Sequence, residues 1–274
     1  MAQLFTGTTR PAAVAGMFYP RDPGELHTAV DAMLRAAPQS EPASRAPKAI
    51  VAPHAGYIYS GPIAASVYAL LTPACDRIQR VVLLGPTHRV AVNGLALPEA
   101  EAFVTPMGTV PIDREAVAAV RRLPQITTSS AAHAYEHSLE VHLPFLQAIL
   151  GAFTLVPFAV GYADAEEVAE VLDTLWGGTE TLLVISSDLS HYHPYDEAQT
   201  IDRGTASAIL ALRTDITHEQ ACGATPVIGV NLAARRRGLQ PQLVDLRNSG
   251  DTAGDRGRVV GYGAFAYFEE RDEH

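Results

Sequence analysis

The sequence predicts an α/β fold, an α/β/α sandwich in which helices cover both faces of a central, mainly parallel or mixed sheet. Short apolar runs rich in valine, isoleucine and leucine recur along the chain, as in strands buried on both faces. Amphipathic stretches of helical length lie between these runs, and such alternation favours βαβ units. The chain has 274 residues, of which 47% are hydrophobic and 18% are charged, as in ordinary globular proteins. Because no segment resembles a linker, we expect residues 1–274 to form a single domain.

The expected elements follow one another along the chain. Residues 9–23 carry several prolines and are expected to be extended before a first helix at 23–35. Buried strands are expected at 48–52, 80–84, 153–160 and 181–185. Further helices are expected at 61–71, 113–122, 144–150, 165–176, 196–212 and 226–237. Two last strands at 240–246 and 259–268 are joined by a loop at 248–257 with turn-forming residues, and the charged tail 269–274 is expected to fray.

Charge and cysteine content exclude several classes of protein. Thirty acidic and twenty basic side chains leave a formal charge of -10, so we expect no nucleic-acid partner. The basic run 235–237 ends an expected helix, where cations suit the helix dipole. Two cysteines are too few for a disulfide framework and fit a reducing compartment. The sequence has neither a membrane-spanning stretch nor a signal-peptide pattern, so a cytoplasmic protein without a membrane partner is expected.

Polar side chains able to do chemistry follow several of the expected strands directly. The first buried strand runs into His54, the second into His88, and a later one into Asp188 and His191. Ligands of open α/β sheets bind beyond the carboxyl ends of the strands, where loops present side chains above a rigid scaffold. A single histidine in such a place is more often a loop residue than a ligand. Their coincidence at several strand ends predicts one shared site.

The segment EHSLEVHLP at 136–144 resembles a metalloprotease motif but has the wrong spacing. Its histidines and glutamate form H-x-x-E-x-H, whereas zincins need H-E-x-x-H and the inverted form needs H-x-x-E-H. Pro144 fits best as the first residue of a new helix, which places His142 at a helix entrance, in the pocket. His137 and Glu140 either join the pocket or simply hold the preceding turn.

The two cysteines differ in their sequence context. Cys222 precedes an expected helix in which Thr225 is the N-cap and Pro226 the first residue. Backbone N–H groups at a helix start lower a thiol pKa, and this favours the thiolate that binds metals. Packing is the alternative role for Cys222. Cys75 follows a helix exit without histidine neighbours, so we expect it to be a small packing residue.

Several motifs together resemble the Memo family, whose prokaryotic members are also called AmmeMemoRadiSam system protein B. The motifs are PHAGY at 53–57, LGPTH at 84–88, EHSLEVHLP at 136–144, SSDLSH at 186–191 and CG at 222–223. The resemblance covers nearly the whole chain and implies a fold like that of the LigB-type class III extradiol dioxygenases. It also implies a metal set of His54, His88 and Cys222, an acid/base role for His191, and pocket positions for Asp188 and His142.

One departure from the dioxygenases changes the expected chemistry. Those enzymes hold non-haem Fe(II) with two histidines and a glutamate, whereas this chain offers a thiolate in place of the carboxylate. A soft sulfur ligand favours metals such as copper(I) or zinc over magnesium or calcium, so iron(II) and copper are the expected cofactors. The first hypothesis is therefore a metal-dependent redox enzyme of the oxygenase type acting on an unknown substrate. In it, His191 and His142 move protons and Asp188 orients a neighbouring ring.

Three other functions are weighed against this one. The same pocket could hold a small molecule or peptide without chemistry, as the eukaryotic relatives are linked with phosphotyrosine peptides. The system name associates the family with AMMECR-type and radical SAM proteins, so a partner role in a modification pathway stays open. Hydrolysis with Ser186, Ser187 or Ser190 as nucleophile is disfavoured, because no G-x-S-x-G elbow surrounds these serines.

Overall fold

The computed structural model describes residues 7–38 and 46–269, and the end of the expected frayed tail, from residue 270 on, lies outside them. Within these residues the chain forms a nine-stranded sheet in the order β10-β12-β2-β9-β3-β8-β4-β7, with β11 paired to β12. Its strands are β2 (Ala49–Ala52), β3 (Arg80–Pro86), β4 (Leu95–Leu97), β7 (Ile126–Thr128), β8 (Thr154–Val160), β9 (Thr181–Ser186), β10 (His191–His193), β11 (Gln240–Asn248) and β12 (Val259–Phe268). All six strands expected from the apolar runs are therefore present.

The central strands of the sheet are parallel, and an antiparallel pair flanks them on each side. Strands β2, β9, β3 and β8 run in the same direction, whereas β12 is antiparallel to β2 and β4 is antiparallel to β8. The register pairs Ala52 with Ser186, and Leu84 with Ile185, so β2, β9 and β3 end at the same edge of the sheet. This mixed sheet confirms the expected architecture and brings the segments after these strands together.

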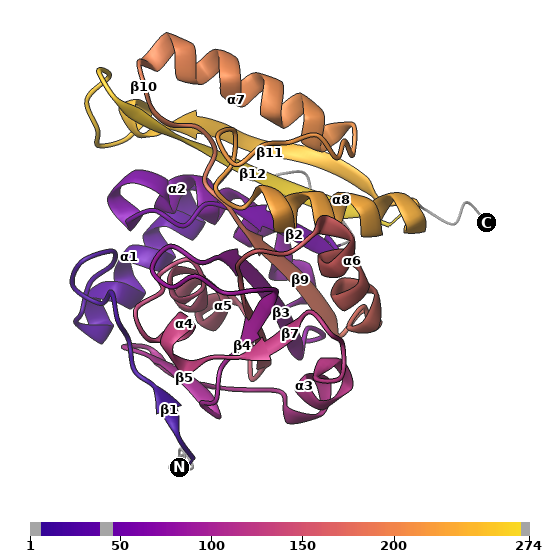
Figure 1. Ribbon diagram of the computed structural model, residues 1–274. Coiled ribbons are helices and arrows are strands. Elements are labelled where there is room, and N and C mark those ends of the chain that lie inside the picture. The colour runs from indigo at the N-terminus through magenta and orange to yellow at the C-terminus, as the bar shows by residue number, and fades with distance from the viewer. Residues whose placement is uncertain (1–6, 39–45, 270–274) are drawn as a thin grey trace.

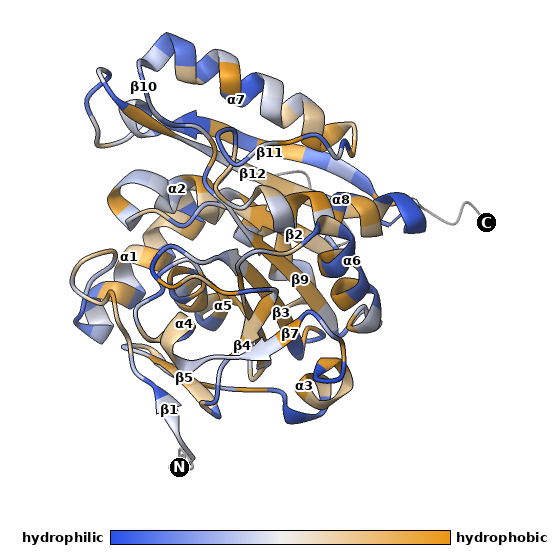
Figure 2. Ribbon diagram, viewed as in Figure 1, coloured by the Kyte–Doolittle hydropathy of each residue, from blue (hydrophilic) through white to orange (hydrophobic). Residues whose placement is uncertain are grey.

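Helices cover both faces of the sheet, as Figure 1 shows. On one face lie α1 (Pro23–Ala36), α2 (Tyr57–Tyr68) and α5 (Leu143–Ile149), whose apolar side chains join one buried cluster with the strands. On the other face α3 (Arg114–Val120), α6 (Ala165–Thr174), α7 (Tyr195–Leu210) and α8 (Ala224–Arg237) build a second cluster. The central strands are strongly hydrophobic and the outer helices carry hydrophilic residues (Figure 2), which matches an α/β/α sandwich.

Several short elements were not expected. A separate sheet consists of β1 (Thr9–Arg10), β5 (Ala102–Thr105) and β6 (Gly108–Pro111). Of the segment 9–23, which was expected to be extended, only the two residues of β1 form a strand. The remaining additions are β4, β7, β10, the helix α4 (Ser130–Ala134) and the 3-10 turns η1 (Ala69–Ala74), η2 (Glu140–His142) and η3 (Ser249–Asp251). These pieces have two to six residues, too few for a hydrophobic period to stand out from the surrounding loops.

Two helix starts differ from expectation. Helix α2 begins at Tyr57 rather than at residue 61, with Pro62 inside it, because most of its side chains are buried and packing outweighs the missing N–H of the proline. Helix α8 begins at Ala224, with Gly223 as its N-cap, so Thr225 is not the cap. Pro226 lies within the first turn, where a missing N–H costs no helical hydrogen bond.

The basic run at the end of α8 serves packing between helices. Arg236 forms ion pairs with Asp173 and Glu166 on α6, and Arg237 pairs with Asp173 and lies over the Trp176 ring at 4.2 Å. These contacts fasten α8 to α6 beside the second apolar cluster. No helix of the described residues combines the length and apolar character needed to cross a bilayer.

Candidate metal centre

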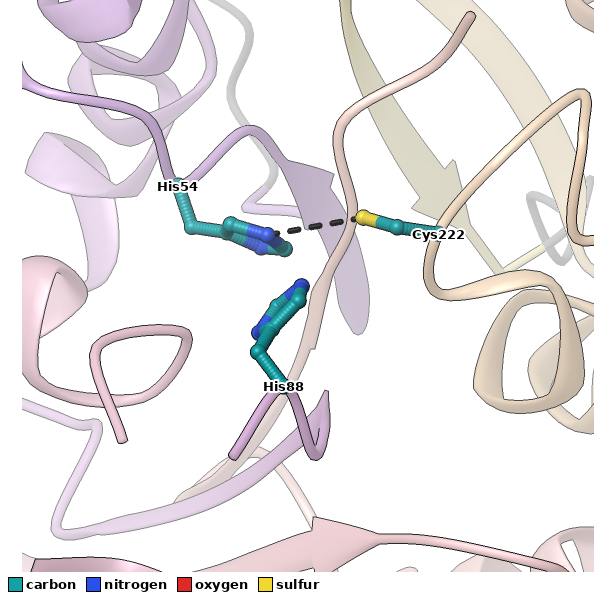
Figure 3. A group of neighbouring side chains, drawn as sticks. All are labelled: His54, His88 and Cys222. Atoms are coloured by element: carbon teal, nitrogen blue, oxygen red, sulfur yellow. Dashed lines mark hydrogen bonds between the residues drawn. The ribbon is translucent and has the colours of Figure 1, made fainter. Parts of the chain in front are cut away.

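Three side chains from distant parts of the chain converge at the sheet edge. His54 follows β2, His88 follows β3 and Cys222 precedes α8, and their ligand atoms all lie within 4.8 Å of one another. Figure 3 shows the two rings and the sulfur pointing toward a common point. The Cys222 Sγ lies 3.4 Å from His54 Nε2. His54 is buried, whereas the His88 side chain is 29% exposed and opens the group to solvent.

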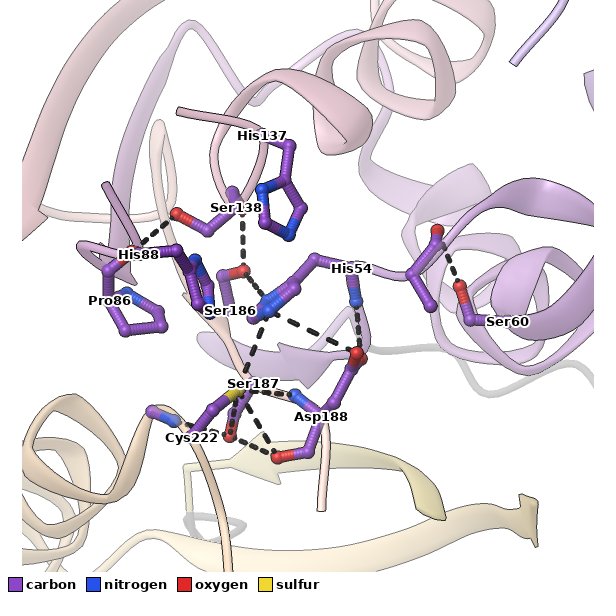
Figure 4. Close-up of polar contacts among 12 residues, drawn as sticks. His54, Ser60, Pro86, His88, His137, Ser138, Ser186, Ser187, Asp188 and Cys222 are labelled. Atoms are coloured by element: carbon purple, nitrogen blue, oxygen red, sulfur yellow. Dashed lines mark hydrogen bonds and ion pairs between the residues drawn. The ribbon is translucent and has the colours of Figure 1, made fainter. Parts of the chain in front are cut away.

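A chain of hydrogen bonds fixes the tautomer of His54. Its Nδ1 lies 2.7 Å from the Ser186 Oγ, and the Ser186 hydroxyl donates to the carbonyl of Ser138 at 2.6 Å (Figure 4). Because the single hydroxyl proton of Ser186 is used in that way, its oxygen accepts from His54, and Nδ1 carries the ring proton. Nε2 then carries no proton, and its lone pair faces the Cys222 Sγ.

Glu136 holds His88 in a similar way. Its Oε1 accepts from His88 Nδ1 at 2.9 Å and its Oε2 accepts from the backbone N–H of His88 at 2.6 Å. The backbone N–H groups of His137 and Ser138 also donate to Oε1, each at 3.0 Å. Burial alone would raise the pKa of Glu136, but the hydrogen bonds from His88 and Ser138 lower it to about 2. The carboxylate is therefore charged and leaves Nε2 of His88 as the free nitrogen.

The state of Cys222 contradicts the expected thiolate. Burial and the neighbouring Asp188 carboxyl raise the pKa of the thiol to about 12, although the N–H of Asp188 donates to Sγ at 3.3 Å. The start of α8 does not compensate, because desolvation of a charged sulfur outweighs a helix dipole. Without a metal, Cys222 is a protonated thiol. A cation bound there would have to displace the proton, as metals do at cysteine sites.

Asp188 holds backbone rather than an imidazole ring. Its Oδ1 accepts from the backbone N–H of His54 at 2.7 Å, and its Oδ2 lies 4.0 Å from His54 Nε2. The expected task of orienting a ring thus belongs to Ser186 for His54 and to Glu136 for His88. Burial raises the pKa of Asp188 to about 7, with the hydrogen bond from His54 acting in the opposite direction.

The two histidines with expected proton-transfer roles lie in different surroundings. His191 is half-buried, and its Nδ1 donates to the carbonyl of Leu189 at 2.8 Å, which leaves Nε2 as the acceptor nitrogen. Burial lowers its pKa, so the ring is neutral at pH 7. His142 is buried, and its Nδ1 lies 2.9 Å from the Tyr68 hydroxyl. Besides His54, His88 and Cys222, the described residues hold a second group of converging donor atoms on His88, Glu136 and His137. His142 belongs to neither group, and its role stays a prediction.

His137 and Glu140 divide between the two roles left open. The His137 ring stacks on His88 with centroids 4.6 Å apart and lies 5.4 Å from the His54 ring, so it belongs to the site. Burial lowers its pKa to about 4, and the charge of the nearby Arg89 acts in the same direction. Glu140 is fully buried elsewhere: it pairs with Arg10, accepts from Tyr19, and binds backbone N–H groups of the N-terminal segment. It anchors that segment to the core.

The serines of the 186–190 segment have structural contacts. Ser186 binds His54 and Ser138, as described above. The Ser187 hydroxyl donates to the Asp188 carbonyl at 2.7 Å and accepts from the N–H of Gly223 at 2.9 Å. Ser186, Ser187 and Ser190 are all buried. None is an exposed nucleophile, which agrees with the missing nucleophile elbow.

Glu136, Ser186 and Ser138 are site residues that sequence reasoning missed as such. All three stand inside the motifs at 136–144 and 186–191, but nothing in their spacing indicates which ring each one holds. Cys75 is half-buried and lies outside both donor groups of the described residues, so its packing role stays a prediction, and both cysteines are free thiols.

Comparison with known proteins places this chain in a family. Residues 10–266 match the sequence profile described as Memo-like protein. The chain belongs to this family. A MEMO1 family protein of Aquifex aeolicus is 38% identical, with 92% of this chain and 97% of the relative covered. The MEMO1 family protein of Methanopyrus kandleri is 35% identical over 94% of this chain and 98% of its own length.

A solved structure supports the fold of this Memo-like chain. The uncharacterized protein JW3007 from Escherichia coli K12 superposes with a TM-score of 0.53 at 14% sequence identity, over 81% of this chain and 100% of that one. At this identity the likeness concerns the fold alone. It agrees with the α/β sandwich described above.

Proposed function

We propose that this Memo-like protein is a metal-dependent redox protein whose centre is formed by His54, His88 and Cys222. The observation that carries the proposal is the convergence of two imidazole nitrogens and one sulfur within 4.8 Å of one another. Ser186 holds the His54 ring through Nδ1, and Glu136 holds the His88 ring in the same way. The unprotonated Nε2 of each ring is therefore able to bind a metal ion. Second contacts of this kind are typical of histidines that bind metals.

The donor set fits copper best, with iron(II) as the alternative. Two imidazoles and one thiolate form the set used by trigonal copper sites, and a thiolate favours Cu(I) over hard cations. Non-haem iron oxygenases use two histidines and a carboxylate. Asp188 offers a carboxyl group beside the centre, 4.0 Å from His54 Nε2, and is the residue that would adapt the site to iron.

The other residues would support chemistry on a ligand bound next to the centre. A bound copper or iron ion supplies one-electron redox chemistry. His191 is neutral and has Nε2 free, so it can accept a proton from a hydroxyl group of a substrate. Cys222 and His88 lie on the wall of an open cleft of about 390 Å³, a volume suited to a small molecule. The proposal that the reaction is of the oxygenase type rests on the resemblance of the sequence motifs alone.

The test is a comparison of metal binding by two cysteine variants. Under anaerobic conditions, Cu(I) and Fe(II) are titrated in competition with a chromophoric chelator into the parent protein, Cys222→Ser and Cys75→Ser. We expect Cys222→Ser to lose at least ten- to a hundredfold in Cu(I) affinity, as loss of a direct ligand should exceed loss of an outer contact. Cys75→Ser should bind like the parent. Equal Cu(I) and Fe(II) affinities for the parent and Cys222→Ser would refute the proposed centre.

A further inference from the structure

The cleft that opens on the proposed centre carries no acidic side chain on its walls. Its lining consists of residues 86–92 and 160–162 together with His218 and Cys222. Three other clefts of the described residues each have at least one carboxylate in their lining. The chain as a whole has a formal charge of -10. The lining of this cleft instead contains the positive charge of Arg89 and no carboxylate.

Arg89 is the free cation of this cleft. Within residues 7–38 and 46–269 its guanidinium has neither an ion-pair partner nor a hydrogen bond, and it lies close enough to act on the His137 ring. His218 is engaged: its Nδ1 lies 3.2 Å from the Cys222 carbonyl and its Nε2 lies 3.1 Å from the Thr225 hydroxyl. Arg89 therefore has all its donors available to a ligand, whereas His218 does not.

We infer that the cleft binds a small organic anion whose carboxylate or phosphate group contacts Arg89. A guanidinium can donate two parallel hydrogen bonds to either group. Val90 and the Tyr162 side chain, which is 77% exposed, offer apolar surface for the rest of the molecule. His88 and Cys222 lie on the same wall, so a donor group of the anion faces the metal, a step that rests on the proposed function.

The experiment compares two anionic probes with a neutral probe that carries the same phenyl ring. Benzoate, phenyl phosphate and benzamide are titrated into isotopically labelled protein, with and without Zn²⁺ as a redox-silent metal, and amide shifts of Thr87, Val90 and Tyr162 are followed. The parent should bind an anion at the cleft at least about tenfold more tightly than benzamide. In Arg89→Gln this preference should be lost. Arg203→Gln removes the same charge from the exposed side of α7 and should keep it.

The outcomes separate this inference from the metal proposal. If Arg89→Gln keeps the preference for anions, or if neither anion shifts the cleft amides of the parent, the inference is wrong. If anions bind through Arg89 but the protein takes up no metal, the anion site stands and the metal centre fails. The relative affinities of benzoate and phenyl phosphate identify the anionic group that the cleft prefers.

Discussion

Three histidines at or near the proposed metal centre are each held through Nδ1 by a different kind of acceptor. His54 donates to a hydroxyl oxygen of Ser186, His88 to the carboxylate of Glu136, and His191 to the carbonyl of Leu189. In each ring Nε2 is left as the free nitrogen. A histidine whose N–H donates to a carboxylate is a better metal ligand than one whose N–H donates to a hydroxyl group. His88 is therefore expected to be the stronger ligand of the two metal-facing histidines.

Removing the hydroxyl of Ser186 should weaken metal binding without removing a ligand. In Ser186→Ala the proton of His54 is no longer confined to Nδ1, and the ring can take the tautomer with a protonated Nε2. We expect Cu(I) affinity to fall by about ten- to a hundredfold, measured by chelator competition. In the metal-free protein, the ¹⁵N shifts of His54 should change from the Nδ1–H form toward a mixture.

Ser190→Ala provides the matched control for that experiment. Ser190 is a buried serine of the same segment, and its hydroxyl makes no hydrogen bond of normal geometry with the described residues. Its removal should leave both Cu(I) affinity and the His54 shifts unchanged. A Ser186→Ala protein with parental ¹⁵N shifts at His54 would show that Ser186 does not set the tautomer.

The residues found from sequence are those whose position depends on strand ends. His54 and His88 follow strands that are easily recognised as apolar runs, and parallel strands end at a common edge. Glu136 and Ser186 act through contacts made only after folding, so their spacing did not indicate their partners. The predicted lowering of the Cys222 pKa was wrong for the same reason. The sequence reveals the nearby helix start, but it does not reveal the burial whose effect on the thiol is larger.

At the scale of elements, long buried strands and amphipathic helices were predictable, whereas short strands were not. Strand β8 has seven residues with one apolar run, but β4 has three and takes its place through pairing with β8 and β7. The exact start of α8 also depends on tertiary contact. Gly223 packs against the end of β9, where a Cβ atom would lie 2.5 Å from the Ser186 carbonyl oxygen.

Gly223→Ala should displace the start of α8 and with it Cys222. The added methyl group meets backbone at Ser186 and the Cβ of Ser187 at 2.8 Å, so the helix start must move away. We expect a loss of about 1–3 kcal/mol in the free energy of unfolding, measured by urea denaturation, together with weaker Cu(I) binding.

The control for Gly223→Ala is a glycine with free space around it. Gly204 lies inside α7, and a Cβ atom there meets nothing within 4 Å. Gly204→Ala should therefore raise the free energy of unfolding by about 0.4–1 kcal/mol, because alanine has the higher helix propensity and a less flexible unfolded chain. If both variants were equally stable, close packing at Gly223 would not fix the start of α8.

At the scale of the whole molecule, several histidines are buried in a neutral form. Burial lowers the pKa of His133 and His137 to about 4 and that of His142 to about 3, and the pKa of His54 is also lowered. Burial raises the pKa of Asp188 and Asp202, which acts in the opposite direction. The lowered histidines outnumber these two carboxyls. The folded metal-free protein therefore binds fewer protons than the unfolded chain between about pH 4 and 6.5.

The metal-free protein should lose stability as the pH falls below about 6.5, by ~1.4 kcal/mol per pH unit for each net proton that only the unfolded chain binds. Urea unfolding at several pH values between 5 and 7 measures this slope.

His133 lies apart from the proposed ligands, and its Nε2 contacts the Ala96 carbonyl at 2.8 Å. His133→Gln should reduce the slope by one proton, since this residue can no longer bind one on unfolding. A parental slope in His133→Gln would mean that His133 does not titrate differently in the two states.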